Sequence, residues 1–554
     1  MEDQIRRRLE QIAAQLSGQS MPVELVYPEA AFGDYSSNIA LQLAGRLKRQ
    51  PLAIAKEVAA EFNRQSQLAT AAAVLPGFVN LTLSGAALLQ QLLQSPRRPL
   101  HNKVVVAEYA DPNPFKLLHA GHLYTAVVGD AIANLLVYAG AKVFRVNYGG
   151  DVGLHVAKSL WAMQQDLGGS DLEKLTAIPA EDRADWMNRA YITGSEAYDN
   201  DARAKQDIIE LNRRIYQIQA DHDLQSDLAQ LYWTTRQWSY DYFRYFYDRI
   251  SVRFDKFYPE SETFAPGLEI VRRQQANGVF ETSDGAVVFR GERFGLHTRV
   301  FINSAGLPTY EAKELGLLVL KQQDFHFDRS IIITGNEQQQ YMAVVLKSVE
   351  QFAPELAQAT THLTHGLLRL AGGKKMSSRK GNNLLAEAVL DAASDAAGEI
   401  SGQRDDRVVL AAVKYALLRQ HMGGDIIFDP KESVNILGNS GPYLQYAHAR
   451  ACSILSKKAA PDKLSEVVFD AGERPLILKL SRYADILDQA AASLSPHLLC
   501  GYLYELTQTF NRFYEVNRVI GDRREELRLY LVKQYASRLK EGLGLLGIDA
   551  PGRL

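Results

Sequence analysis

Residues 104–122 read VVVAEYADPNPFKLLHAGH. The run opens with apolar, mostly β-branched residues, which predict a buried strand at 104–107. A loop punctuated by Pro112 and Pro114 follows and leads into a helical pattern that begins near Leu118. A strand, a short loop and a helix in this order are typical of a unit in a doubly wound α/β sheet.

The predicted helix begins with His119-Ala120-Gly121-His122. His119 and His122 lie three positions apart and so share one helical face. Because a helix N-terminus presents free N–H groups and a positive dipole, two imidazoles there add donors for a phosphate chain, and Gly121 lets a flat base approach. A capping or core histidine is the ordinary interpretation of either residue alone.

A second stretch, Lys375-Met376-Ser377-Ser378-Arg379-Lys380-Gly381, gathers cations on a loop. Such cations stabilise the negative charge that grows on diphosphate as it leaves ATP, and the flanking glycines suit a loop that closes over a ligand. Alone, this run is typical of a solvated basic turn. Together with the paired histidines it predicts a nucleoside triphosphate site.

Short β-branched runs alternate with longer helical patterns from about residue 100 to 395. This alternation predicts an α/β, Rossmann-like domain with a parallel sheet, whose ligands lie beyond the carboxyl ends of the strands. A charged helical segment at about 160–255 indicates an insertion. The strands are expected at 104–106, 143–146, 330–334 and 365–370.

Segments of different character flank this domain. Residues 1–95 mix helices with short strands, one of them at 77–83, and predict an α+β domain followed by a linker at 95–99. From about 400 to 554 we see no convincing strand and expect an all-α bundle. Its expected core includes Leu503, Leu506, Phe510 and Phe513.

The composition limits the number of domains, the kinds of partner and the compartment that we expect for this chain. The 554 residues are too many for one domain, and the net charge of −2 means that a nucleic acid must be met by local basic patches. Cys452 and Cys500 suggest neither a metal site nor a disulfide framework, so a reducing compartment, the cytoplasm, is expected. The longest helix-like apolar stretch, 131–141, is too short for a bilayer, which needs about 20 residues, and we expect no membrane partner.

The whole chain resembles the class I arginyl-tRNA synthetases. The most specific stretch is 108–114, EYADPNP, leading through Lys116 into the histidines. Other similar segments are 252–255 closing on Glu260-Ser261, Thr309-Tyr310, Gly335 with Gln338, 438–450 and 544–551. The resemblance implies a catalytic domain at 100–395, an added N-terminal domain at 1–95 that meets the tRNA elbow, and an anticodon-binding bundle at 400–554.

The implied activity is arginine–tRNA ligation: ATP activates L-arginine, and tRNA(Arg) receives the arginyl group on its terminal adenosine. Catalysis would come from positioning and from cations, with Mg²⁺ assisting and no metal ligand assigned to the chain. A monomer is expected. The resemblance places ATP at His119, Gly121, His122, Lys375, Met376 and Ser377, with His119, His122, Lys375 and Lys380 as catalytic residues.

Arginine selection requires anions that match a planar, always charged guanidinium. Glu108 and Glu314 can supply them, and Tyr310 offers a ring face and a hydroxyl. Without the resemblance, Glu314 would be interpreted as a surface carboxylate paired with Lys313. The resemblance adds Asn113, His122 and Gln338 as contacts to arginine.

Single-stranded RNA bases are read by stacking and edge hydrogen bonds. The expected tRNA contacts are Tyr443, Gln445, Tyr446, Arg450, Tyr514 and Arg518 in the helical domain, and Phe78 and Asn80 in the N-terminal domain. Ordinary strand packing is an equal alternative for the last two.

The chain departs from the family pattern at Glu314, where aspartate is usual, and at Tyr341, where histidine is usual; it keeps Lys375, which many relatives lack. An enzyme for another amino acid is disfavoured by the two acids, and a silent tRNA-binding paralogue by the intact signatures. A Rossmann oxidoreductase is disfavoured because no G-x-G-x-x-G opens the first helix.

Overall fold

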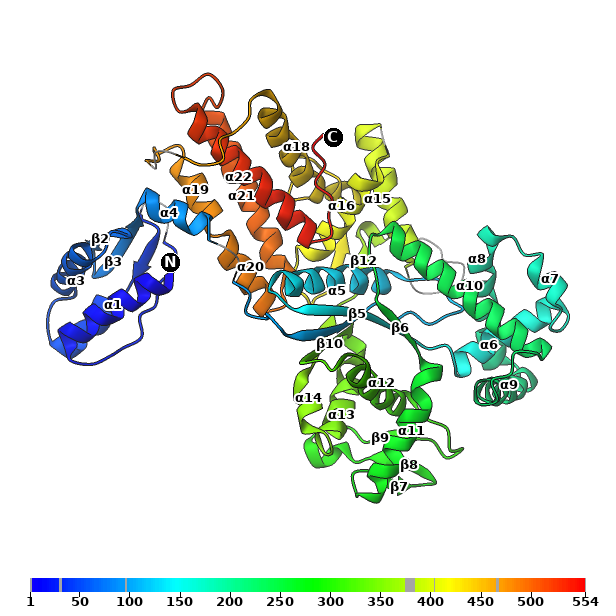
Figure 1. The fold of residues 1–554 in the computed structure, drawn as a ribbon. Helices are drawn as coiled ribbons and strands as arrows, with labels where there is room; N and C mark the ends of the chain where they lie inside the picture. The colour runs from blue at the N-terminus through cyan, green and yellow to red at the C-terminus, as the bar shows by residue number, and fades with distance from the viewer. Residues whose placement is uncertain are drawn as a thin grey trace.

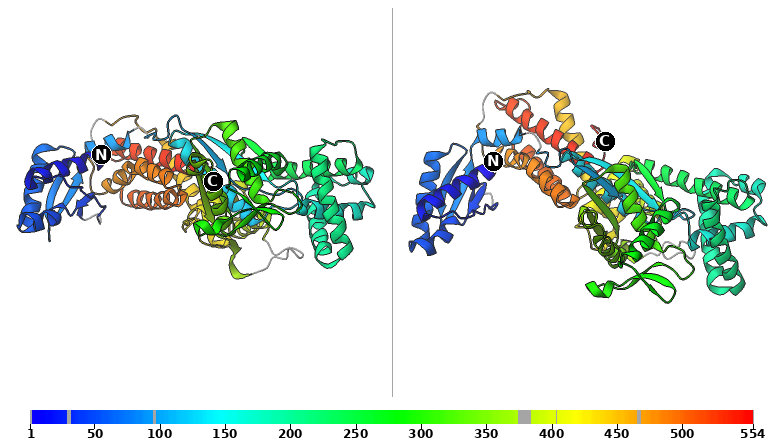
Figure 2. Two further views of the ribbon diagram at one scale, coloured as in Figure 1. Left: turned by 90° about the horizontal axis from the view of Figure 1, so that it is seen from below. Right: turned by 60° about the horizontal axis from the view of Figure 1, so that its bottom comes forward.

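The computed structural model describes residues 2–28, 32–94, 97–373, 384–402, 404–464 and 468–553. Figure 1 shows a small N-terminal domain beside a helical bundle, with a central sheet domain below the bundle. The other views show an elongated molecule, with the N-terminal domain at one end and the helices α6–α9 at the other (Figure 2).

The central sheet is parallel throughout and has the strand order β11-β10-β4-β5-β6. Numbered along the chain, this is the 5-4-1-2-3 arrangement of a doubly wound fold, and the order reverses between β4 and β10. The predicted Rossmann-like class is therefore confirmed. The bounds are β4 Val104–Glu108, β5 Lys142–Gly149, β6 Lys256–Pro259, β10 Arg329–Gly335 and β11 Thr360–His365.

The strand expected at 365–370 was wrong in its limits. The sheet strand β11 ends at His365, and Leu368–Leu370 form a separate short strand, β12, which pairs in parallel with β13 (Ile426–Phe428). The helical last third of the chain thus supplies one short strand that was not predicted.

Helix α5 (Ala120–Tyr138) fills the centre of the fold and connects β4 to β5. Among the described residues it is the one helix long and apolar enough to cross a membrane, and 78% of that apolar window is buried inside the protein. The apolar stretch expected at 131–141 is therefore the second half of a longer helix. Its apolarity is explained by burial on all sides.

Two insertions enlarge the sheet domain. Between β5 and β6 lies the expected helical segment, which comprises α6 Leu154–Leu167, α7 Leu172–Thr176, α8 Arg183–Asn200, α9 Ala202–Ala220 and α10 Asp227–Arg249. Between β6 and β10, a small antiparallel sheet that was not predicted, β7 Glu281–Ser283, β8 Ala286–Phe289 and β9 Arg299–Ile302, lies between α11 Glu260–Ala276 and α12 Tyr310–Phe325. Helices α13 Gln339–Glu350 and α14 Pro354–Ala359 connect β10 to β11.

The N-terminal domain packs α2 and α3 on a sheet of order β1-β3-β2, and α1 lies against these two helices. Helix α4 follows the sheet and packs against α19 (Arg474–Ser481) of the helical domain. The elements of the N-terminal domain are α1 Glu2–Ser17, β1 Tyr35–Ser37, α2 Ile39–Leu47, α3 Pro51–Gln65, β2 Ala69–Val74, β3 Phe78–Leu83 and α4 Gly85–Leu92. Asp34, which is 3% exposed, pairs with Arg474 of the bundle, and the Arg482 guanidinium lies 3.9 Å over the Tyr27 ring. These contacts fasten the N-terminal domain to the helical domain.

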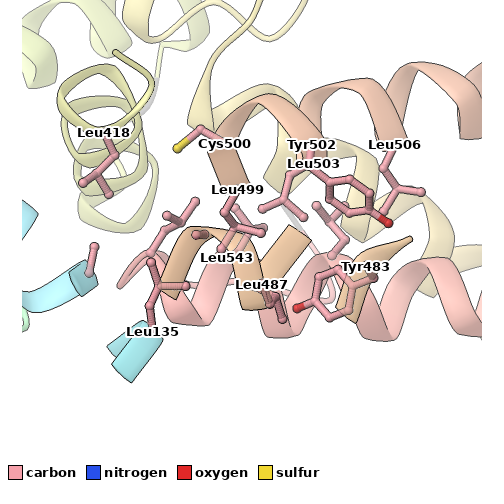
Figure 3. Close-up of a cluster of buried hydrophobic side chains, with 14 of the residues drawn as sticks. Leu135, Leu418, Tyr483, Leu487, Leu499, Cys500, Tyr502, Leu503, Leu506 and Leu543 are labelled. Carbon is pink, nitrogen blue, oxygen red and sulfur yellow. The ribbon is translucent and has the colours of Figure 1, made fainter. Parts of the chain in front are cut away.

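The helical domain is all-α apart from β13. Figure 3 shows leucines of α20, α21 and α22 meeting Leu135 of α5, so that one core runs through the bundle into the sheet domain. Leu503, Leu506, Phe510 and Phe513 are at most 2% exposed, which confirms their prediction as core. The helices are α15 Ala386–Ser401, α16 Asp406–Leu418, α17 Pro430–Ser433, α18 Gly441–Lys457, α19 Arg474–Ser481, α20 Tyr483–Ala492, α21 Pro496–Val516 and α22 Glu525–Leu545.

Candidate functional site

The paired histidines close the N-terminus of α5 as a reciprocal cap. The backbone N–H of Gly121 donates to Nδ1 of His119, and the N–H of His119 donates to Nδ1 of His122, each over 3.1 Å. Their rings stack with centroids 3.6 Å apart. A Cβ at Gly121 would lie 2.9 Å from the His119 ring, so glycine is what allows the ring to fold back over the helix start.

This cap fixes the chemistry of both imidazoles. Burial lowers the pKa of His119 to about 4, and burial together with His119 and Lys116 holds the pKa of His122 well below its usual value. Both rings are therefore neutral near pH 7. Because each Nδ1 accepts a hydrogen bond, the single ring proton of each must be on Nε2, which gives two Nε2–H donors at the positive end of the helix.

The cationic stretch predicted to act with these histidines lies outside the described residues, and so do its site candidates Lys375, Met376, Ser377 and Lys380. The chain just beyond it is described and returns to the histidines. Leu385 pairs with His119 in an antiparallel bridge, the N–H of Ala120 donates to the Leu384 carbonyl over 2.7 Å, and that of Ala386 donates to the Leu118 carbonyl. Two stretches far apart in sequence are thus joined at the start of α5.

The loop between β4 and α5 is held in a strained shape. Ala110, Asp111 and Phe115 have positive φ angles of 76°, 44° and 69°, which are uncommon for residues with side chains. Side chains fasten this loop to the end of β5: Asp111 accepts the Tyr148 N–H over 2.8 Å, and Oδ1 of Asn113 accepts the Gly150 N–H over 2.9 Å. No acceptor for the two side-chain N–H donors of Asn113 is found among the described residues.

Several carboxylates surround the carboxyl ends of β4, β5 and β6, and most of them already have cations. Glu108 at the end of β4 pairs with Lys321 of α12, and both side chains are at most 2% exposed. Glu260 pairs with Lys313 over 2.6 Å, with both side chains 4% exposed. Asp151 pairs with Arg236 over 2.8 Å. Neither Lys313 nor Lys321 was singled out from the sequence as a pocket residue.

Glu314 differs from these acids because it has no ion pair among the described residues. Its Oε2 is shielded from solvent and has no hydrogen-bond partner. Burial and the charge of Glu108 raise its pKa to about 8, although Lys321 and a hydrogen bond with Tyr341 lower it in part. The alternative of a surface carboxylate paired with Lys313 was wrong, because Lys313 turns to Glu260. The two departures from the family pattern, Glu314 and Tyr341, are in contact.

The remaining predicted arginine contacts border the same region. Tyr310 opens α12, is 54% exposed, and has the Lys313 ammonium 5.1 Å from its ring centroid. Gln338 closes a short 3₁₀ turn, Asn336–Gln338, directly after β10, and is half-buried. Both therefore lie at element ends near the reversal of strand order, where the fold places ligands.

The predicted tRNA contacts divide into exposed and buried residues. On the bundle, Tyr446, Arg450, Tyr514 and Arg518 are exposed, and the Arg450 guanidinium lies 5.4 Å over the Tyr514 ring. Gln445 contradicts the prediction: it is 0% exposed, and its amide donates to the carbonyls of Asp549 and Arg407 over 2.8 and 3.2 Å.

Tyr443 is half-buried, and its hydroxyl accepts a hydrogen bond from Asn511. In the N-terminal domain Phe78 is half-buried. Asn80 is 8% exposed and accepts the Ser36 hydroxyl over 2.7 Å, so strand packing accounts for most of its surface. The described residues contain no group of three or more histidine, cysteine, aspartate or glutamate side chains that could hold a metal ion.

Comparisons with known proteins agree along the whole chain. Residues 1–83 match the arginyl tRNA synthetase N terminal domain, residues 85–428 the catalytic domain of class I tRNA synthetases (R), and residues 444–554 the DALR anticodon binding domain. The arginine–tRNA ligase of Bacteroides fragilis is 28% identical over 589 aligned residues, covering 97% of each chain, and that of Flavobacterium psychrophilum is 28% identical over 488, covering 82% of this chain and 80% of the relative.

Two solved structures share the complete fold. The arginyl-tRNA synthetase of Thermus thermophilus superposes with a TM-score of 0.80 at 25% identity, covering 100% of both chains. That of Plasmodium falciparum gives a TM-score of 0.79 at 18% identity, covering 100% of this chain and 99% of the other.

Proposed function

The chain belongs to the class I arginyl-tRNA synthetases and is an arginine–tRNA ligase, and from this premise we propose how its residues divide the reaction. The arginine carboxylate attacks the α-phosphate of ATP, and diphosphate leaves, which gives arginyl-adenylate. A hydroxyl of the terminal ribose of tRNA then attacks the activated carbonyl, and AMP leaves. No protein nucleophile is required, so the enzyme acts by positioning and by charge.

At the ATP end, the Nε2–H donors of His119 and His122 contact the phosphate chain. Two observations support this contact: the hydrogen bonds to Nδ1 fix the tautomer of each ring, and both rings lie at the positive end of α5. Lys375 and Lys380 act on the leaving diphosphate, and Met376 and Ser377 contact the nucleotide. The bridge between His119 and Leu385 supports this proposal, because it brings the chain just beyond that stretch to the histidines.

At the arginine end, Glu314 accepts the guanidinium. Its Oε2 is shielded from solvent, and no cation pairs with it in the described part of the chain. A guanidinium supplies the charge and the donors that this carboxyl group lacks. Tyr310 covers the guanidinium with its ring, while Asn113, Gln338 and His122 contact the amino acid backbone. The observation that carries the proposal for arginine is the shielded Oε2 of Glu314, which has no partner among the described residues. Glu108 was predicted as a second acceptor, but its carboxylate already binds Lys321.

Mg²⁺ would accompany ATP. Because this ion keeps several waters and is bound mainly through substrate phosphates, it requires few protein ligands. The donor set of the described residues fits this limited role, since it contains no dedicated cluster. The ion would supply charge neutralisation at the phosphates when bound.

For tRNA, Arg450, Tyr446, Tyr514 and Arg518 form one exposed face across α18 and the end of α21 that suits an anticodon loop. Tyr443 borders it, and Phe78 with Asn80 would meet the tRNA elbow from the N-terminal domain. We further propose a cytoplasmic monomer, because one chain carries both catalytic and tRNA-binding domains and both cysteines are free thiols. Gel filtration with light scattering tests the monomer.

Pyrophosphate exchange with each amino acid, with and without tRNA(Arg), tests the proposed function. We expect exchange with arginine alone, and, as the family implies, only with tRNA present. Exchange driven by another amino acid would overturn the arginine assignment. Absence of exchange with every amino acid would instead favour the silent paralogue.

A further inference from the structure

Lys321 lies beneath the arginine site proposed above. It follows Glu314 by two turns on the same face of α12 and is 0% exposed. Its ammonium donates to the carboxylate of Glu108 at the end of β4 and lies 3.3 Å from the Ser330 hydroxyl of β10. One cation therefore joins the helix of Glu314 to the two strands between which the strand order reverses.

The charge balance of the pocket depends on this pair. A buried ammonium or carboxylate without a partner is strongly unfavourable, so Lys321 and Glu108 depend on each other. Glu108 raises and Lys321 lowers the pKa of Glu314, which means that both partners lie within electrostatic reach of that acid. Asp111, the other acid nearby, has its pKa raised well above the usual value by burial and by Glu108. Its Oδ1 already accepts the Tyr148 N–H over 2.8 Å.

We propose that Lys321 is a specificity-determining positioning residue: it takes up the charge of Glu108 and thereby leaves Glu314 as the acid that ionises and pairs with a substrate cation. The inference rests on the proposed arginine site. The pocket then accepts a side chain with one delocalised positive charge. A neutral side chain offers Glu314 no opposite charge, so Glu314 would stay protonated and add nothing to the binding of that side chain. Glu108 then acts on arginine only through Lys321.

The competing arrangement is direct: Glu108 would leave Lys321 and bind the guanidinium itself. The two arrangements predict the same result for Glu108→Gln alone. In either case the KM for arginine rises, either because a contact is lost or because the released ammonium of Lys321 neutralises Glu314. They differ when Lys321 is neutralised as well.

The test measures tRNA-dependent pyrophosphate exchange for Glu108→Gln and for Glu108→Gln/Lys321→Met. We expect the single variant to raise the KM for arginine by about 100-fold, the order of effect of uncovering one buried charge, with little change in the KM for ATP. The double variant should return the KM for arginine to within about threefold of the parent, because Glu314 is again the free carboxylate. A double variant as weak as the single one would overturn the proposal, and so would an unchanged KM in Glu108→Gln.

Three further variants keep the result interpretable. Glu108→Gln/Lys321→Gln replaces the ion pair with two amides that can hydrogen-bond to each other, and it gives the same decision if the methionine version does not fold. Asp324→Asn, near the end of α12, breaks the exposed pair with Lys256 of β6 and should leave both KM values unchanged. Glu314→Gln separates the two proposals: an unchanged KM for arginine there would refute the site itself, whatever the Glu108 variants do.

Discussion

His119 and His122 stack with their ring planes 19° apart, and each uses Nδ1 to accept a backbone N–H of the same helix start. The two roles of each ring can therefore be tested separately, because Nδ1 caps the helix and Nε2 would bind the phosphate. The histidines would be poor general acids at neutral pH, since burial lowers the pKa of both. They are better suited to donate fixed hydrogen bonds to a developing charge.

His119→Asn tests this separation. Asparagine caps helices well but has no donor in the Nε2 position, so the melting temperature should stay near that of the parent. The rate of arginine-dependent exchange should fall by about 100-fold, as when one preorganised donor is removed from a transition state. His119→Ala should lose both, with about 1 kcal/mol of stability. Parent-like exchange in the asparagine variant would contradict the role of Nε2.

Glu314→Gln should weaken arginine capture far more than ATP binding. The guanidinium would lose its ionic partner, and loss of a charge-assisted hydrogen bond costs about 1.5–3 kcal/mol, or roughly 10- to 150-fold in the KM for arginine. Steady-state exchange with each substrate varied in turn checks this. Equal losses for arginine and ATP would mean that the residue supports the whole fold of the site.

The pH dependence of arginine binding follows from the same carboxyl group. Burial and Glu108 raise the pKa of Glu314 to about 8, so the free enzyme holds it mostly neutral at pH 6, whereas arginine remains charged. The KM for arginine should therefore fall as pH rises from 6 to 8, by at most about tenfold per unit, and binding should release a proton. Calorimetry in buffers of different ionisation enthalpy measures that proton. Glu314→Gln should abolish the dependence; a flat profile in the parent would contradict it.

Local patterns allowed the Rossmann-like domain and the helix that begins at the paired histidines to be predicted, because both depend on residues close together in sequence. The capping role of these histidines was only the ordinary alternative, and the structure shows it. Strand β11 was misplaced because Thr360–His365 consists of threonine and histidine with a single leucine. It lies at the edge of the sheet beside β10, where no apolar run is required. The pairing of Glu108 with Lys321 spans 213 positions and has no local signal. A helical spacing of four and eleven positions from Tyr310 to Glu314 and Lys321 could have placed all three on one face.

Gln445 illustrates the same limit in the helical domain. Its helix resembles the family's anticodon-arm contact, which predicted an RNA contact, but the C-terminal segment folds back and accepts a hydrogen bond from its amide. Arg450→Ala should raise the KM for tRNA and reduce the salt dependence of binding by about one ion. Gln445→Ala should instead lower stability by about 1–2 kcal/mol without changing that salt dependence. Filter binding at several salt concentrations, with thermal unfolding, distinguishes the two; a reduced salt slope in Gln445→Ala would reverse the assignment.

The attachment of the N-terminal domain gives a last prediction. Asp34 accepts the Leu83 N–H over 2.6 Å and pairs with Arg474, while its carbonyl accepts a hydrogen bond from Arg482 over 3.0 Å. Asp34→Asn keeps an acceptor for the backbone but leaves Arg474 without its charge partner, which is costly at a buried position. We expect about a tenfold higher KM for tRNA and faster proteolysis between the domains, with the KM for arginine unchanged. Asp3→Asn breaks an exposed pair with Arg6 and should change neither quantity. If Asp34→Asn also raised the KM for arginine, the contact would have to act on the catalytic site and not only on the position of the N-terminal domain.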